Sequence, residues 1–258
     1  MNELTTINTI TTTLLAVLGA CAGSFINVAA LRRGGDFSFI SGRSHCPSCR
    51  QTIKWYDLVP VLSWLLLAGR CRACKVRISS RYPLVELTGG AVFALCFAVF
   101  GFSYMTLLAI GVSSVLMAVS LIDLGTTEIP NGLIIALVPF AVAAYFVQPE
   151  ISLISRGIGF FAVSLPLLAL AVAISGAFGG GDIKLVAVCG FLLWWQNILL
   201  AFFVAVLLGG SYAVYLLTSG KRKRREHMVF GPALCAGIIF AMFFGEQIIS
   251  WYWGLFNA

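Results

Sequence analysis

The sequence has few charged residues: Asp, Glu, Lys and Arg make up only 10% of its 258 residues, whereas 60% are hydrophobic. Several apolar runs reach about 20 residues, enough for a helix to cross a hydrocarbon core of about 30 Å. These runs lack the apolar–polar alternation of membrane β-strands, which excludes a barrel. Because lipid otherwise tolerates only helices, the composition predicts an all-α polytopic membrane protein.

The first apolar run lacks the basic n-region of a cleaved signal peptide and is followed by Arg32 and Arg33. We therefore expect a retained span with its N-terminus outside. In all, the sequence predicts about eight transmembrane helices, with both termini outside. Trp194 and Trp195 then fall at an external helix end, as expected of an aromatic belt. The predicted spans cover residues 5–30, 83–101, 105–123, 131–148, 156–177, 183–195, 197–218 and 229–252.

Basic residues are absent from most of the segments that connect these spans. Sixteen of the seventeen Lys and Arg residues lie within 32–81, at Lys184 or within 221–225, and only Arg156 lies elsewhere. Placing these three regions in the cytoplasm satisfies the positive-inside rule. We interpret the net charge of +7 as a topological signal beside a lipid bilayer and expect no nucleic-acid partner. An apolar stretch at 55–67 is too short to span and is expected to lie along the interface.

The basic loop before the second predicted span contains two closely spaced cysteine pairs. Cys46 and Cys49 form the first pair, and Cys71 and Cys74 form the second. Four thiolates at this spacing can close a tetrahedral site, which zinc usually occupies. Two disulfides or redox pairs are the alternative, against which a cytoplasmic location argues. The sequence thus favours a cytoplasmic zinc-ribbon-like loop with four cysteine ligands.

Acidic residues are also scarce, and two of the ten lack a simple structural explanation. Asp123 and Asp182 both fall at the cytoplasmic end of a predicted span, where a carboxylate is costly and indicates function. The glycines before the second acid, among them Gly179 and Gly181, let the backbone bend or approach another segment closely. Lys184 follows Asp182 by two residues and on a helix would point away from it.

Two carboxylates at one membrane face have two interpretations. In an aspartyl protease, one carboxylate activates water while the protonated other polarises the scissile carbonyl group. In an ion-coupled transporter the acids would form a relay, although such sites tend to lie near the bilayer midplane. Spacing alone does not choose between them.

Glu86 lies near the start of the second predicted span, after Arg81 and Pro83. We interpret it as a negative charge placed at the positive N-terminus of a helix, with Arg81 nearby. A supporting role beside the active site is the alternative.

Short motifs follow one another in a fixed order through nearly the whole chain. They are Gly23-Ser24-Phe25-Ile26-Asn27-Val28, the two cysteine pairs, Arg81-Tyr82-Pro83-Leu84-Val85-Glu86, Asp123 with Ile129-Pro130, Gly179-x-Gly181-Asp182-x-Lys184-Leu185, and Phe230-Gly231-Pro232. This ordered set resembles the type IV prepilin peptidase family. A presenilin-like intramembrane aspartyl protease would share only the Gly-x-Gly-Asp element.

The resemblance implies a bifunctional enzyme of the bacterial inner membrane, serving type IV pili or type II secretion. As an aspartyl endopeptidase it would cut the basic leader from prepilins or pseudopilins at the cytoplasmic face, with Asp123 and Asp182 as the catalytic pair. As a methyltransferase it would then methylate the new N-terminal amine with S-adenosylmethionine. The sequence has no recognisable glycine-rich cofactor loop, so no cofactor-binding residue is predicted. We accordingly divide the chain into residues 1–82, the span and zinc loop to which the resemblance assigns methyl transfer, and residues 83–258, the peptidase bundle.

The sequence departs from the family pattern at several positions. Asn131 follows Pro130, where the family often has aspartate. Arg50 and Lys75 follow the two cysteine pairs, where glycine is common in zinc knuckles, so the sequence leaves the turn geometry open.

Overall fold

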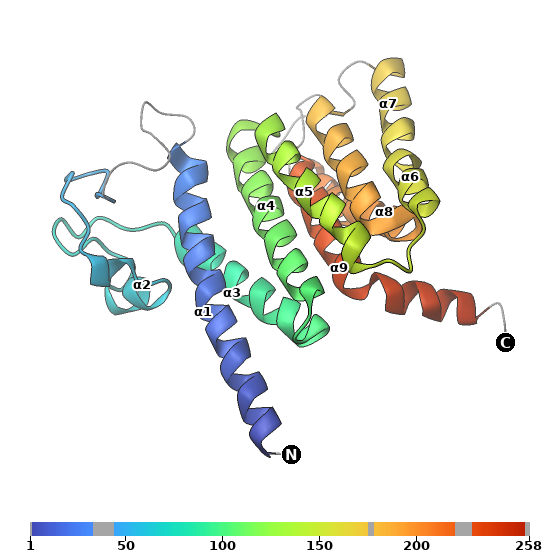
Figure 1. The fold of residues 1–258 in the computed structure, drawn as a ribbon. Coiled ribbons are helices and arrows are strands. Elements are labelled where there is room, and N and C mark those ends of the chain that lie inside the picture. Colours follow the sequence, from blue (N-terminus) through green and yellow to red (C-terminus); the bar gives the residue numbers. More distant parts are fainter. Residues whose placement is uncertain (1, 33–43, 175–177, 220–228, 256–258) are drawn as a thin grey trace. The chain divides into compact units, whose positions relative to one another are not determined.

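The computed structural model describes residues 2–32, 44–174, 178–219 and 229–255, and helices dominate this part of the chain (Figure 1). The prediction of an all-α protein is confirmed, because the described residues form no strand beyond two isolated bridges. In chain order the elements are α1 (Asn2–Arg32), η1 (Trp55–Leu58), α2 (Leu62–Leu66), α3 (Arg81–Phe100), α4 (Tyr104–Thr126), α5 (Asn131–Val147), α6 (Leu153–Ala162), α7 (Ser164–Ala173), α8 (Gly180–Thr218) and α9 (Gly231–Gly254).

Six segments of the described chain are helices long and apolar enough to cross a membrane. They are α1, α3, α4, the consecutive pair α6 and α7, α8, and α9, which makes this a multi-pass membrane protein. Each predicted span lies mostly on helical residues, although the span at 156–177 contains two helices and those at 183–195 and 197–218 share α8. Residues 175–177 lie outside the described residues. The number eight stays a prediction, because it requires counting α5, which has only 17 residues, and dividing α8 in two.

A proline explains the break between α6 and α7 inside one predicted span. Pro166 lacks an N–H group, and its ring crowds the carbonyl group of Ala162, four residues earlier. Val163 between the two helices keeps a near-helical backbone, with φ −108° and ψ −35°. The predicted span is therefore interrupted rather than ended.

The interruption of α8 lies where the sequence predicts a boundary between two spans. Trp194 has a non-helical backbone, with φ 55° and ψ 176°. The regular partners of the Phe191 and Leu192 carbonyl groups lie across this break, and Nη1 of Arg156 donates to both oxygens, at 3.3 and 3.0 Å. Its Nη2 donates to two carbonyl oxygens at the C-terminal end of α5. The one basic residue outside the predicted cytoplasmic regions is thus fully buried and stabilises two helix ends.

Trp194 corrects part of the predicted aromatic belt. Its side chain is only 6% exposed, so it packs in the protein core and does not anchor a helix at the membrane surface. Trp251 and Trp253 near the end of α9 are exposed by 66% and 49%, as a membrane-facing belt requires.

Contacts divide the chain into two compact units, Met1–Thr106 and Leu107–Ala258. In the first unit, α1 and α3 pack so closely that a Cβ atom on Gly19 or Gly89 would overlap the carbonyl oxygen of the other. Gly19 and Gly23 form a G-x-x-x-G pattern, which permits such an approach between membrane helices. In the second unit, α8 is central and packs against α5, α6, α7 and α9.

Candidate active site and metal centre

Asp123 lies one turn before the C-terminal end of α4, and its side chain is only 5% exposed. It is therefore buried and does not face water. Its Oδ2 accepts a hydrogen bond of 3.0 Å from the backbone N–H of Gly231, the first residue of α9, whose N–H has no partner within the helix. A Cβ atom on Gly231 would lie 2.5 Å from the same oxygen. The glycine of the Phe230-Gly231-Pro232 motif is thus what lets the helix end reach the carboxylate.

Asp182 lies half-buried in the first turn of α8, where the helix dipole favours a negative charge. Its Oδ2 accepts a hydrogen bond of 3.3 Å from the N–H of Gly179. Gly181 packs against Ile129, in the segment that follows α4, leaving no room for a side chain. The negative charge of Asp123 acts on the Asp182 carboxylate. The two predicted acids therefore lie within electrostatic range of each other in the second unit.

Lys184 connects the ends of two helices beside these acids. Its Nζ donates a hydrogen bond of 3.1 Å to Oδ1 of Asn131, the first residue of α5. Asn131, at a position where the family often has aspartate, thus offers this lysine a neutral acceptor. Together with the Asp123–Gly231 bond, this contact gathers the C-terminal end of α4 and the N-terminal ends of α5, α8 and α9 at one end of the unit (Figure 1).

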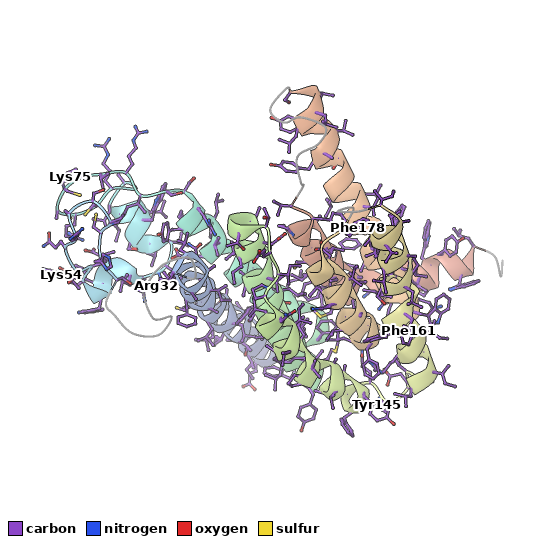
Figure 2. All side chains as sticks on the ribbon, turned by 90° about the horizontal axis from the view of Figure 1, so that it is seen from above. Arg32, Lys54, Lys75, Tyr145, Phe161 and Phe178 are labelled. Atoms are coloured by element: carbon purple, nitrogen blue, oxygen red, sulfur yellow. The ribbon has the colours of Figure 1, made fainter. Side chains whose placement is uncertain are left out.

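Aromatic rings fix the residue before Gly231. The ring of Phe230 contacts those of Phe178 and Phe202, with centroid distances of 5.7 and 6.5 Å. Phe178, labelled in Figure 2, directly precedes the turn that carries Gly179. The rings therefore link the two glycine segments that donate hydrogen bonds to the acids.

The four predicted cysteine ligands form a compact cluster in the first unit. The sulfur atoms of Cys46, Cys49, Cys71 and Cys74 all lie within 4.8 Å of one another, and those of Cys46 and Cys74 are 3.8 Å apart. Four sulfurs about 2.3 Å from a tetrahedral ion are separated by about 3.8 Å. Hydrogen bonds from the backbone N–H groups of Cys49 and Ser48 lower the pKa of the Cys46 thiol to about 6, which favours the thiolate that binds metal. The cluster thus fits a tetrahedral metal ion, and none of the four cysteines forms a disulfide bond.

The two cysteine turns have the same backbone structure, on the loop marked by Lys54 and Lys75 in Figure 2. In each turn the N–H of the first cysteine donates to the carbonyl oxygen five residues later, at 3.0 Å from Cys46 and 2.9 Å from Cys71. Arg50 and Lys75 have φ values of 57° and 59°. They adopt the left-handed conformation that usually requires glycine, so their side chains leave the metal-binding turn geometry intact.

Glu86 lies in the second turn of α3, because the helix begins at Arg81. The interpretation as a first-turn charge therefore does not hold, since the helix dipole acts within the first turn. Glu86 is 7% exposed, and its Oε2 accepts a hydrogen bond of 2.7 Å from the N–H of Val61. Val61 precedes α2 and has φ 62°, which is rare for a β-branched residue. Glu86 thus ties a membrane helix to the loop that holds the cysteines.

Two family models match consecutive parts of the chain. Residues 17–100 match the bacterial peptidase A24 N-terminal domain, and residues 110–214 match the type IV leader peptidase family. A Bacillus subtilis protein named prepilin leader peptidase/N-methyltransferase is 38% identical over 93% of this chain and 96% of its own length. The chain belongs to the type IV leader peptidase family.

Other similar proteins carry the same name. One from Myxococcus xanthus is 35% identical over 85% of this chain and 68% of its own length, and one from Neisseria gonorrhoeae is 30% identical over 91% of each. No solved structure matches the chain. The part that matches the leader peptidase family contains Asp123 and Asp182, whereas the cysteines and Glu86 lie in the part that matches the N-terminal model.

Proposed function

We propose that this chain is a membrane aspartyl endopeptidase that removes the leader from type IV prepilins or pseudopilins and then methylates the new N-terminal amine. Both activities appear in the names of its relatives. The observation that best supports the peptidase site is the proximity of Asp123 and Asp182, which come from different helices and each accept a glycine N–H.

Asp123 and Asp182 act together in the proposed hydrolysis. One carboxylate takes a proton from the water that attacks the scissile carbonyl carbon, while the protonated other gives its proton to the carbonyl oxygen. As the carbon–nitrogen bond breaks, the first acid passes the proton from water to the leaving amine, and the second regains its proton from the tetrahedral intermediate. Like charges at short range repel, so a pair that holds one proton is favoured over two free carboxylates. The N–H groups of Gly231 and Gly179 hold the two acids in orientation.

The proposed active site lies at the cytoplasmic face of the bacterial inner membrane. Lys184 lies beside it, and the other basic residues are concentrated in the segments that this topology places inside. The apolar helix of a prepilin would lie in the bilayer beside the bundle, which leaves the bond between leader and helix at the depth of the two acids.

The four cysteines would hold a structural zinc ion, since thiolate ligands in this geometry favour zinc. S-adenosylmethionine would supply the methyl group. We assign methyl transfer to the first unit, which comprises the predicted segment 1–82 together with α3, and proteolysis to the second unit.

Co-expression with a prepilin, followed by mass analysis of its N-terminus, tests both activities. We expect Asp123→Asn and Asp182→Asn each to abolish cleavage, while the exposed neighbour Glu128 tolerates replacement by Gln. Cleavage by either Asn variant at normal protein level would refute the assignment. A cut within the membrane span of the substrate would instead indicate a presenilin-like protease, and ion flux without cleavage would indicate a transporter.

A further inference from the structure

Asn27 in α1 is a buried polar side chain whose hydrogen bonds are incomplete. It is 0% exposed, and neither its Nδ2 nor its Oδ1 has a hydrogen-bond partner in the described part of the chain. Buried amide groups nearly always have partners, and those that lack them call for an explanation. Something other than these protein groups therefore completes the hydrogen bonds of Asn27.

Glu86 packs beside the turn of α1 that precedes this amide. Gly23 precedes Asn27 by one helical turn on the same face of α1, and a Cβ atom on Gly23 would lie 3.3 Å from the Cα atom of Glu86. From Gly23 to Asn27 the helix runs toward its C-terminal end, after which the chain enters the cysteine loop, and Glu86 binds Val61 of this loop. Asn27 and Glu86 thus both lie in the part of the α1–α3 pair that adjoins the loop.

Glu86 also differs from the other described acids of the first unit, because it is buried and has no basic partner among the described residues. The described acids there are Glu3, Asp57 and Glu86. Glu3 lies at the opposite end of α1, and both oxygens of Asp57 accept hydrogen bonds from Arg72, at 2.9 and 2.7 Å. No ion pair among the described residues includes Glu86, although it is buried. A buried carboxylate without a cation is costly, so this site favours a positively charged ligand with N–H donors.

We propose that Asn27 and Glu86 bind the amine that is to be methylated, namely the free N-terminal amine of the cleaved substrate; the inference rests on the proposed methyl transfer. The Glu86 carboxylate pairs with the ammonium form and takes its proton, and the Oδ1 atom of Asn27 accepts a second N–H. The nitrogen lone pair then forms a bond to the methyl carbon of the sulfonium donor. The carbon–sulfur bond breaks with its electrons going to sulfur, and a second nitrogen proton is released to water.

Glu86→Gln separates this role from a structural one. A glutamine can still accept the N–H of Val61, so the fold is retained, but the negative charge is lost. We would titrate purified enzyme with a labelled peptide of the mature substrate N-terminus, either free or N-acetylated, without the methyl donor. The wild-type protein should bind the free amine at least about tenfold more tightly than the acetylated peptide, the ratio expected of one charge-assisted hydrogen bond. Glu86→Gln should lose most of this preference, whereas Glu3→Gln should keep it.

Asn27→Leu provides a second, independent test. Leucine has a similar size and removes a buried amide without partners, so the variant should be at least as stable to heat as the wild type. It should nevertheless lose the preference for the free amine and release cleaved but unmethylated product. A purely structural asparagine predicts normal methylation in this variant.

Cleavage and binding together separate this inference from the proposed function. Unchanged preference for the free amine in both variants overturns the inference, whether or not methylation occurs. A wild-type enzyme that cleaves but never methylates in the presence of S-adenosylmethionine counts against the proposed methyl transfer instead. Unchanged cleavage in both variants is expected, because Asp123 and Asp182 belong to the other unit.

Discussion

Adjacent glycines at the start of α8 differ in what surrounds them. A Cβ atom on Gly181 would lie 2.8 Å from the Cβ atom of Ile129, whereas one on Gly180 meets nothing within 4 Å. We therefore expect Gly181→Ala to push the first turn of α8 away from the segment after α4 and to reduce kcat for leader cleavage by about tenfold or more, as small displacements of catalytic groups do. Rates measured on a purified prepilin would test this.

Gly180→Ala is the matched control for this effect. It makes the same chemical change one residue earlier and, because its site is open, should cleave at a rate close to the wild type. Equal loss in both variants would mean that backbone freedom, rather than contact with Ile129, explains the glycines.

The left-handed residues of the cysteine turns give a second prediction at this scale. Arg50 and Lys75 have positive φ values, which cost a residue with a side chain about 1–2 kcal/mol. Replacing either by glycine should stabilise the loop by about 1 kcal/mol, after the loss of about 0.5–1 kcal/mol to the greater freedom of unfolded glycine. The chelator concentration that removes half of the metal should rise.

Lys54→Gly is the control for these turns, because Lys54 has an ordinary φ of −73°. It should bind the metal no more tightly than the wild type. An increase in metal retention there as large as in the two turns would refute the strain argument.

Part of both sites could be predicted from the types of residue alone. Two acids without a structural explanation and four cysteines at metal-binding spacing are visible in the sequence, and the structure brings the members of each set together. The hydrogen bond from Gly231 to Asp123 was not predictable in the same way. It depends on where α9 begins in space, and a backbone N–H carries no mark of its role in the sequence.

At the scale of helices, Arg156 supports the prediction with the largest expected effect on stability. Replacing it by Met leaves carbonyl groups of α5 and α8 without donors in the protein interior. Each unsatisfied buried group costs about 1–3 kcal/mol, so we expect a loss of at least about 3 kcal/mol and a fall in the unfolding midpoint of at least about 6–12 °C. Thermal unfolding in detergent would measure it.

Arg156→Lys keeps the charge but has fewer donors in a fixed geometry, so its midpoint should lie between those of Arg156→Met and the wild type. Lys54→Met, at an exposed position, should leave the midpoint unchanged. A stable Arg156→Met protein would show that water satisfies the broken end of α8.

The apolar runs and the polar residues that flank them predicted the positions of the helices nearly correctly. The two breaks within predicted helical regions have different causes, and only one of them is visible in the sequence. The break at Val163 has a sequence signal in Pro166. The break at Trp194 has neither proline nor glycine beside it and depends on a guanidinium group supplied by α6. The sequence predicted a boundary at Trp194 because tryptophans often line the membrane surface. The position was correct but the reason was wrong, since Trp194 is buried.

At the scale of the whole molecule, the two candidate sites lie in different compact units. The cysteine cluster and Glu86 belong to the first unit, and both aspartates belong to the second. Sequence motifs indicated two sites, and the close packing of α1 against α3 holds the two long helices of the first unit together. The G-x-x-x-G pattern in α1 is a signal from which this contact could have been predicted.

Removing the proposed zinc ion should therefore affect the two activities differently. Strong chelation, or Cys49→Ser, leaves the remaining thiolates unable to close a tetrahedral site, so the loop between α1 and α3 loses its cross-link. Because Glu86 contacts this loop through Val61, methylation should fall at least about tenfold, as when supporting groups of a metal site are removed. Cleavage should stay within about twofold of the wild type, since the described hydrogen bonds to Asp123 and Asp182 come from Gly231 and Gly179 of the second unit. Metal content and the masses of the processed substrate, measured on the same preparations, would test this, and parallel loss of both activities would mean that the peptidase also requires the loop.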